Sequence, residues 1–231
     1  MGQDITIQGK DGSFGGYLAK PASGTGPGIV VIQEIFGVNE FVRATADWLA
    51  GEGFVALAPD LFWRIEPGIQ LTDKTEAHWA RAFECYKAFD VARGVEDIQA
   101  TITTLRGIQG CTGKVGATGY CLGGLLAYLT ATRTDADAAV GYYGVGIEGM
   151  LDEAKNISKP LILHIACEDG FVNKEAQAAV HKGLDGNPNV TIHDYAGQDH
   201  AFARMGGEHY DKASADLANS RTLSLFRAKL A

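Results

Sequence analysis

The chain has 231 residues and a formal net charge of −8 at pH 7. Its length suits one large α/β domain or two small ones, and its acidity argues against nucleic acid or an anionic membrane surface as the main partner. No apolar run approaches the roughly 18 residues that span a bilayer, and the opening MGQDITIQGKDGSFGG lacks the apolar core of a secretory signal. The four cysteines are widely spaced without a CxxC pair, which is typical of reduced thiols. We therefore expect a soluble cytoplasmic protein.

The start of the chain predicts a β-hairpin followed by a buried strand. Residues 4–7 and 14–18 are strand candidates, and the turn-rich KDGS lies between them. A glycine- and proline-rich loop follows over residues 21–28, and the apolar run GIVVIQEIFG then indicates a strand buried on both faces. Asn39 can cap the next helix, and residues 54–60 predict another buried strand.

The rest of the chain alternates helices with short apolar strands. Residues 61–75 are irregular, and a long helical region over 76–105 is expected to break near Asp90. Further strands are expected at 114–120, 138–144, 160–166 and 190–195, and further helices at 122–132, 146–154, 174–184 and 213–229. This order predicts an α/β fold with a mostly parallel, doubly wound sheet, helices on both faces and an N-terminal antiparallel hairpin. With no repeat and no linker in the sequence, we expect a single domain over 1–231.

The segment GYCLG at residues 119–123 places a cysteine between a strand and a helix. Hydrolases carry a nucleophile elbow in this setting, a strained turn whose flanking glycines avoid collisions with neighbouring elements. The N-terminus of the following helix favours a thiolate, and the amide of Leu122 can bind a developing oxyanion. Alternatively, Cys121 is a buried core cysteine beside a tight turn, because GxCxG alone is a short pattern.

A base and an acid follow Cys121 in the chain order that such hydrolases use, each in the loop after a later strand. His200 comes just past residues 190–195, and Asp169 or its neighbour Glu168 comes just past 160–166. Taken alone, His200 could be a surface histidine and Asp169 a turn cap. Together with the elbow, these residues predict a Cys-His-Asp triad. The other histidines lack this setting: His78, His164, His181, His193 and His209.

Glu34 ends the buried run GIVVIQ, where a carboxylate is unfavourable unless it is paired. One interpretation makes it a strand-end acid that reaches solvent or pairs with a structural arginine. The other places it beside the elbow, because the loop after this strand usually supplies the second oxyanion N–H, here that of Ile35. A carboxylate there would oppose thiolate formation at Cys121, so this second interpretation needs a further explanation.

Metal and phosphate sites are not predicted. The sequence has no HExxH motif and no pair of histidines at helical spacing beside an acid. GYCLGG also lacks the lysine and the serine or threonine of a phosphate-binding loop.

Six segments together resemble the dienelactone hydrolase (carboxymethylenebutenolidase) family, in order along nearly the whole chain: QEIFGVN, FDVARGVED, KVGATGYCLGG, AVGYYGVG, CEDGFV and GQDHAFAR. The combination of QExFG with GYCLGG is specific. The resemblance implies an α/β-hydrolase fold, a triad carried by Cys121, His200 and Asp169, and no cofactor. It also implies the reaction, in which a thiolate attacks a lactone carbonyl, the ring opens to an enolate that takes a proton, and water releases the acyl-enzyme as maleylacetate.

The resemblance further implies a switch that would explain Glu34. In the family the resting thiol is protonated and turned toward this glutamate, away from the histidine. The substrate carboxylate engages an arginine that pairs with the glutamate, which is then freed to take the thiol proton. The HAFAR segment places that arginine at Arg204. The expected partner is therefore a small anionic lactone or ester.

Two departures from the family pattern bear on the substrate. Counting back from the AFD segment at residues 88–90, the second carboxylate-binding arginine of the family falls on Trp79. The nearest arginine is Arg81, and two residues on one helix correspond to about 200° of rotation. Ala201 stands where the family often has serine. Four aromatic residues could line the substrate or equally belong to the core: Phe36, Trp79, Phe83 and Tyr86.

The leading hypothesis is a monomeric hydrolase of small carboxylate-bearing lactones that acts through an acyl-cysteine. A general carboxylesterase for neutral esters is the alternative if Arg81 and Arg204 do not face the pocket. A third hypothesis is a hydrolase-like protein that binds carboxylates or senses thiol oxidation without catalysis.

Overall fold

The computed structural model describes residues 2–231. The chain forms two compact units, the first ending at Ala117 and the second comprising Thr118–Ala231. The division falls inside strand β5 (Cys111–Tyr120) and not in a linker. The single domain expected over 1–231 stays a prediction.

The first unit contains the N-terminal hairpin and the strands beside it. Strands β1 (Gln3–Gln8) and β2 (Ser13–Ala19) pair antiparallel, as predicted. Strand β2 also runs antiparallel to β4 (Val55–Pro59), and β4 lies parallel to β3 (Gly26–Ile32), whose other neighbour is β5. The buried strands β3 and β4 have almost no exposed residue, which explains their continuous apolar sequences.

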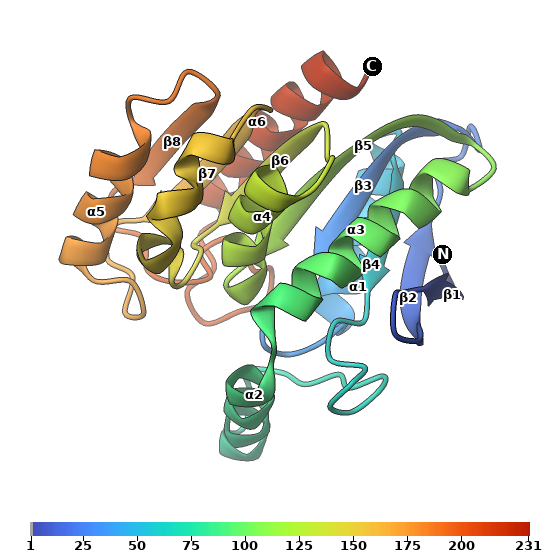
Figure 1. Ribbon diagram of the computed structural model, residues 1–231. Helices are drawn as coiled ribbons and strands as arrows, with labels where there is room; N and C mark the ends of the chain where they lie inside the picture. Colours follow the sequence, from blue (N-terminus) through green and yellow to red (C-terminus); the bar gives the residue numbers. More distant parts are fainter. Residues whose placement is uncertain (1) are drawn as a thin grey trace. The chain divides into compact units, whose positions relative to one another are not determined.

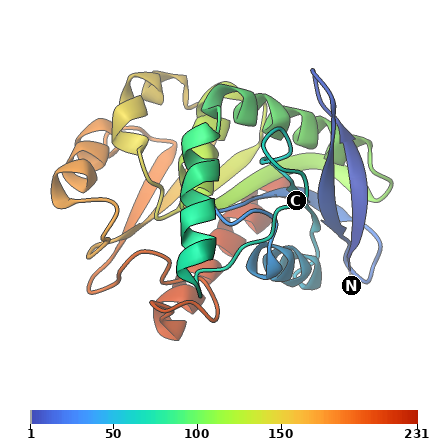
Figure 2. The ribbon, with the colours of Figure 1, turned by 90° about the horizontal axis from the view of Figure 1, so that it is seen from below.

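Helices α1, α2 and α3 each begin after a residue whose side chain accepts a backbone N–H of the first turn: Asn39, Thr75 and Asp90. Helix α1 (Glu40–Gly51) begins after Asn39, whose side chain accepts the Val42 N–H at 3.2 Å. Helices α2 (Glu76–Ala88) and α3 (Val91–Gly107) are separated by an extended residue at Phe89 and by the Asp90 cap, so the predicted break is confirmed. Helices α1 and α3 cover opposite faces of the strands, whereas α2 projects beyond the end of α3 (Figures 1 and 2).

The second unit contains three parallel strands and the helices around them. Strands β6 (Ala138–Tyr142), β7 (Leu161–Ala166) and β8 (Val190–Tyr195) pair in sequence order. Helix α4 (Leu122–Arg133), the 3₁₀ segment η1 (Ile147–Asn156) and helix α5 (Lys174–Leu184) lie on one face of these strands (Figure 1). Helix α6 (Lys212–Leu230) covers the other face, as both views show (Figure 2). The strand directions and the helix layers confirm the predicted fold class.

Strands β3 and β5 begin earlier than the sequence predicts. Strand β3 begins at Gly26, inside the segment predicted as a loop, because the Gly26 N–H donates to the Gly110 carbonyl at 2.9 Å. Strand β5 begins at Cys111, three residues before its apolar run. Both extensions pair backbone groups and leave the side-chain pattern unchanged, so hydrophobicity gives no sign of them.

Within residues 2–231, every helix is too short or too polar to cross a membrane. The same residues contain no cluster of three histidine, cysteine, aspartate or glutamate side chains arranged to hold a metal ion. All four cysteines are free thiols.

Candidate active site

Cys121 occupies the turn between β5 and α4. Its backbone has φ 58° and ψ −115°, a conformation that is strained for any residue with a side chain. Strand β5 ends at Tyr120 and α4 begins at Leu122, so the whole change of direction falls on this residue. The cysteine is partly exposed rather than sealed in the core. This geometry is that of a nucleophile elbow.

Glycines make this turn possible by letting backbones approach closely. A Cβ atom on Gly119 would lie 2.0 Å from the carbonyl oxygen of Gly123, as the sequence pattern predicts. A second close approach involves Gly124, where a Cβ would lie 2.5 Å from the carbonyl oxygen of Tyr142 at the end of β6. The position that packs against the neighbouring strand is therefore Gly124, which the elbow pattern does not include.

The start of α4 places backbone N–H donors beside Cys121. The Cys121 carbonyl accepts the Gly124 and Leu125 N–H groups at 2.9 and 3.3 Å, which fixes the first helical turn. The Leu122 N–H belongs to the first residue of α4, so it has no acceptor within the helix. An anion near Cys121 would meet this amide and the positive end of the helix dipole.

His200 and Asp169 lie together in the loops that follow β8 and β7. The His200 Nδ1–H donates to Asp169 at 2.9 Å to Oδ2 and 3.1 Å to Oδ1, and both side chains are buried. The neighbouring Glu168 is exposed and pairs with Lys174 at 3.0 Å. Of the two acids that the sequence leaves open, the one that reaches the histidine is therefore Asp169.

Backbone amides hold the Asp169 carboxylate in place. Its Oδ1 accepts the Phe171 N–H at 2.8 Å and the Val172 N–H at 3.2 Å. The residue is thus a turn cap as well as the partner of His200, and the two alternatives drawn from the sequence are both present. A carboxylate fixed by two amides presents its remaining lone pairs in one orientation, which suits an acid that orients a base.

The His200 ring is surrounded by charge and by aromatic edges. Burial by itself would lower the pKa of His200, but the electrostatic interaction with Cys121 and the hydrogen bonds to Asp169 and Cys121 outweigh burial and raise it to about 10. The rings of Tyr143 and Phe171 lie T-shaped to the imidazole, with centroids 5.0 and 4.8 Å away. The second unit therefore brings Cys121, His200 and Asp169 together, in a setting that favours an imidazolium.

The sequence analysis did not predict three of the residues that lie beside His200. Tyr143 follows β6 with φ 38°, and Phe171 lies two residues after Asp169. Asp199 directly precedes His200, and its carboxylate accepts the His200 backbone N–H at 2.6 Å. Each residue follows the carboxyl end of a parallel strand, and ligands bind at these ends in α/β folds. This position in the sequence could have indicated them as site candidates.

Arg204 lies in the loop that carries His200, and its side chain is buried. Ala201 has φ 65°, and its carbonyl accepts the Arg204 N–H at 2.9 Å, so a tight turn separates His200 from Arg204. A serine at 201 would have to adopt the same left-handed backbone. The role of Arg204 in binding a carboxylate stays a prediction.

Another buried histidine belongs to the framework of the second unit. His164 lies within β7, and its Nδ1 and Nε2 hydrogen bond to the Tyr195 hydroxyl at 2.9 Å and to Thr222 Oγ1 at 3.1 Å. Burial holds the pKa of His164 well below its usual value. This neutral ring joins β7 to β8 and α6.

The remaining candidates lie in the first unit. Glu34 and Ile35 lie just past the end of β3, after Gln33, and are buried, with Glu34 fully inaccessible to solvent. The preceding Gln33 accepts the Leu61 N–H at 3.0 Å and so ties the exit of β3 to the exit of β4. The segment that carries Glu34 is therefore tied to the residues that follow β4.

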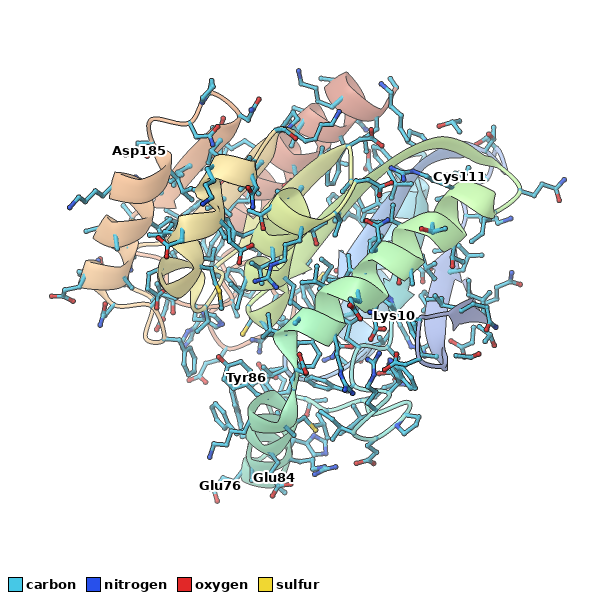
Figure 3. The ribbon with its side chains drawn as sticks, in the orientation of Figure 1. Lys10, Glu76, Glu84, Tyr86, Cys111 and Asp185 are labelled. Atoms are coloured by element: carbon cyan, nitrogen blue, oxygen red, sulfur yellow. The ribbon has the colours of Figure 1, made fainter. Side chains whose placement is uncertain are left out.

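Aromatic rings continue from this segment to α2. The Phe36 ring lies T-shaped to Trp79, with centroids 4.9 Å apart, and Trp79 stacks on Phe83 at 5.6 Å. Trp79 Nε1–H donates to the Asp73 carbonyl at 3.0 Å, which fixes the indole. Phe83 and Tyr86 are each 38% exposed, and Figure 3 labels Tyr86 on α2. Their roles toward a substrate stay predictions.

Arg81 is engaged by two glutamates. Its guanidinium donates to Glu66 at 2.7 Å and to Glu84 at 2.8 Å. Glu84 is one helical turn away on α2, whereas Glu66 belongs to the irregular segment before it. A carboxylate ligand at Arg81 would have to compete with two protein carboxylates.

The comparisons with known proteins agree with this geometry. Residues 14–230 match the model of the dienelactone hydrolase family. A carboxymethylenebutenolidase homologue from Azospirillum brasilense is 48% identical, with 98% of this chain and 99% of the relative covered. The carboxymethylenebutenolidase of Pseudomonas putida is 40% identical, with 96% and 94% covered. A dienelactone hydrolase homologue from Klebsiella pneumoniae superposes with a TM-score of 0.86 at 26% identity, with 98% of each chain covered. The chain thus belongs to the dienelactone hydrolase family, has the α/β-hydrolase fold and is a carboxylic ester hydrolase.

Proposed function

We propose that the protein is a cysteine hydrolase that opens small carboxylate-bearing lactones, with dienelactone and its product maleylacetate as the reaction that the family resemblance implies. The observation that carries the proposal is the arrangement of Cys121, His200 and Asp169. The sulfur lies on a strained elbow at a helix N-terminus and hydrogen bonds to an imidazole whose pKa is raised to about 10. A thiolate beside an imidazolium is the nucleophile and the acid that ester cleavage requires.

The chemistry follows from these groups. The Cys121 thiolate adds to the lactone carbonyl, and a carbon–sulfur bond forms as the carbonyl oxygen becomes an oxyanion. When the intermediate collapses, the ring C–O bond breaks, and the leaving enolate takes a proton from the His200 imidazolium. The neutral imidazole then removes a proton from water, whose oxygen attacks the acyl carbon and displaces the sulfur, so the product leaves as a carboxylic acid and the thiolate–imidazolium pair is restored.

Two backbone amides are proposed to stabilise the oxyanion. Leu122 supplies one from the first turn of α4, where no helical carbonyl competes for its N–H. Ile35 supplies the other from the segment after β3, the position that the fold family uses. Removal of one such donor in other hydrolases costs about 10²–10³ in kcat.

Arg204 is proposed to bind the carboxylate of the substrate. It is buried, and a buried guanidinium gives a charge-assisted, bidentate contact that a neutral ester cannot use. The aromatic residues Phe36, Trp79, Phe83 and Tyr86 are proposed to contact the unsaturated part of the substrate. The protein is further proposed to act as a cytoplasmic monomer.

Glu34 is proposed to receive the proton of the resting thiol when the substrate carboxylate engages Arg204. Its complete burial supports a role beyond solvation at the surface. Glu34→Gln should slow lactone hydrolysis while the far-UV circular dichroism spectrum and the melting temperature stay close to wild type. A wild-type rate in a folded Glu34→Gln protein would make Glu34 a structural residue.

The decisive experiment compares wild type with Cys121→Ala on cis- and trans-dienelactone and on short p-nitrophenyl esters. Cys121→Ala should abolish turnover of all of them, because it removes the proposed nucleophile. Mass spectrometry of the quenched wild-type reaction should show the acyl mass on the peptide that contains Cys121. Activity retained in the alanine variant would overturn the mechanism.

A second candidate is a general carboxylesterase for neutral esters. It is favoured by Arg81, whose guanidinium already carries two glutamate partners, and by Trp79, which is held among aromatic rings. The ratio of kcat/KM for a lactone with and without its carboxylate separates the two. A ratio well above one favours the lactone hydrolase, and a ratio near or below one favours the esterase.

A further inference from the structure

The loops that carry Asp169 and His200 continue the β7–β8 ladder beyond the ends of the strands. The last paired residues are Ala166 and Tyr195. The Cys167 N–H then donates to the Tyr195 carbonyl at 3.1 Å, and the Glu168 N–H donates to the Gln198 carbonyl at 2.8 Å. These two rungs hold the loops together as far as the residue before Asp169.

The next rung is made by a side chain. The Gly170 N–H donates at 2.9 Å to Oδ1 of Asp199, and the same oxygen accepts the His200 N–H at 2.6 Å. Asp169 therefore lies between two cross-links, one at residue 168 and one at residue 170. Because Asp199 immediately precedes His200, its carboxylate fixes the backbones of both residues that form the acid–base pair.

The second oxygen of this carboxylate has its own partner. Oδ2 of Asp199 lies 3.2 Å from Nδ1 of His209, at the far end of the loop that follows His200. Burial would raise the pKa of Asp199, but the two backbone donors and the charges of His209 and His200 outweigh burial and lower it. The Asp199 carboxylate thus has three partners: Oδ1 accepts the two backbone N–H groups, and Oδ2 lies beside His209.

We propose that Asp199 is a positioning residue that sets the geometry of the Asp169–His200 pair by joining the two catalytic loops. This inference rests on the proposed function, in which that pair activates Cys121. Asp199 touches neither the sulfur nor the reacting atoms. It acts by holding the imidazole where Nδ1 meets Asp169, and a displacement of about 1 Å in such a group can cost as much as 10² in rate.

The test compares Asp199→Ala with Asp199→Asn. Alanine removes the acceptor for both backbone N–H groups, so kcat should fall on the order of tenfold or more while KM changes by less than about twofold. Asparagine keeps a carbonyl oxygen in the place of Oδ1, so kcat should return to within about threefold of wild type. A purely electrostatic role would make the two variants alike, which contradicts the proposal.

Asp216→Ala is the matched control, because Asp216 is an exposed acid on α6 that pairs with Lys212 in the same helix. It should leave kcat and KM unchanged. If Asp199→Ala does not fold, Asp199→Glu keeps the charge and moves the oxygen by one methylene, and a wild-type kcat there would overturn the proposal. An inactive wild-type protein would refute the proposed function, whereas an active wild type with an equally active, folded Asp199→Ala would refute this inference alone.

Discussion

The Nδ1–H group of His200 donates to both carboxylate oxygens of Asp169, at 2.9 and 3.1 Å, in a place where both side chains are buried. A buried carboxylate beside a buried imidazole favours the charged form of the ring. The first prediction follows from this pair, because the proposed mechanism requires a protonated His200 when the leaving enolate departs.

The alkaline limb of kcat/KM should have its midpoint near pH 10 in the wild type, the raised pKa of His200. Asp169→Asn removes the hydrogen bond to an anion, so the limb should move toward the ordinary value of 6.5 and kcat should fall by about 10²–10⁴. The measurement is kcat/KM for a lactone from pH 5 to pH 11 in both proteins. An unshifted limb in an active, folded Asp169→Asn would show that Asp169 does not set the charge of His200.

The raised pKa of His200 also makes the free energy of unfolding depend on pH. The folded pKa of His200 lies above its unfolded value, so the contribution of this group is fully present below about pH 6.5 and is lost as the pH rises toward about 10. Urea unfolding of the wild type should therefore show a decline across that window. Asp169→Asn should be less stable at pH 6, and its decline should be smaller.

Much of the candidate site could be predicted because its residues follow elements with clear local patterns. The run GIVVI and the segment LILHIA indicate strands by their continuous hydrophobicity, and Cys121, Asp169 and His200 each come just after a strand. The glycine at 119 is required by the turn itself, since a Cβ there would meet the backbone of Gly123. Such constraints act within a few residues and leave a mark in the sequence.

Contacts between distant loops leave no such mark. Asp199 is bonded to Gly170 across 29 positions, and Arg81 to Glu66 across 15 positions through an irregular segment. Asp199 and Glu66 lie in loops without a periodic pattern, because a loop's path depends on tertiary packing and not on local propensity. For the same reason, the sequence could place Arg81 near Trp79 on a helix but could not show which carboxylates it meets.

The two arginines should differ in their effect on substrate binding. Arg204→Gln should raise KM for a carboxylate-bearing lactone by about 10–100-fold, because a charge-assisted hydrogen bond contributes about 1.5–3 kcal/mol, and should change KM for a neutral ester little. Arg81→Ala should change either KM by less than about twofold, since Glu66 and Glu84 already use its donors. Steady-state kinetics on the matched lactone pair give the comparison. A large effect of Arg81→Ala confined to the charged lactone would move the carboxylate site to α2.

The packing of α4 on β6 should depend on Gly124. In Gly124→Ala the new Cβ would lie 2.5 Å from the Tyr142 carbonyl oxygen and 2.6 Å from Gly144 Cα, both backbone atoms that cannot rotate away. The free energy of unfolding should fall by about 1–3 kcal/mol, the usual cost of overpacking. Gly149→Ala is the control, because a Cβ there meets no atom within 4 Å. Equal stability of the two variants in urea would show that α4 can shift away from β6 at little cost in free energy.

In the first unit, Arg64 should stabilise the irregular segment after β4 through a buried acid. Arg64 donates to Asp97 at 2.5 and 3.0 Å, its guanidinium lies over the Trp63 ring, and Trp63 Nε1–H donates to the same carboxylate at 3.0 Å. The Asp97 side chain is 1% exposed. Asp97→Ala therefore removes the buried partner of the Arg64 guanidinium and the acceptor of the Trp63 Nε1–H. We expect the free energy of unfolding to fall by about 2–3 kcal/mol.

Asp11 supplies the matched control, because it binds the same guanidinium from the exposed side at 2.5 Å. Water replaces an exposed carboxylate readily, so Asp11→Ala should change the unfolding curve little. Urea titrations of both variants, with kcat/KM measured alongside, separate stability from catalysis, since neither acid belongs to the proposed triad. If Asp11→Ala destabilised the protein as much as Asp97→Ala, the burial of Asp97 would not be the source of its effect.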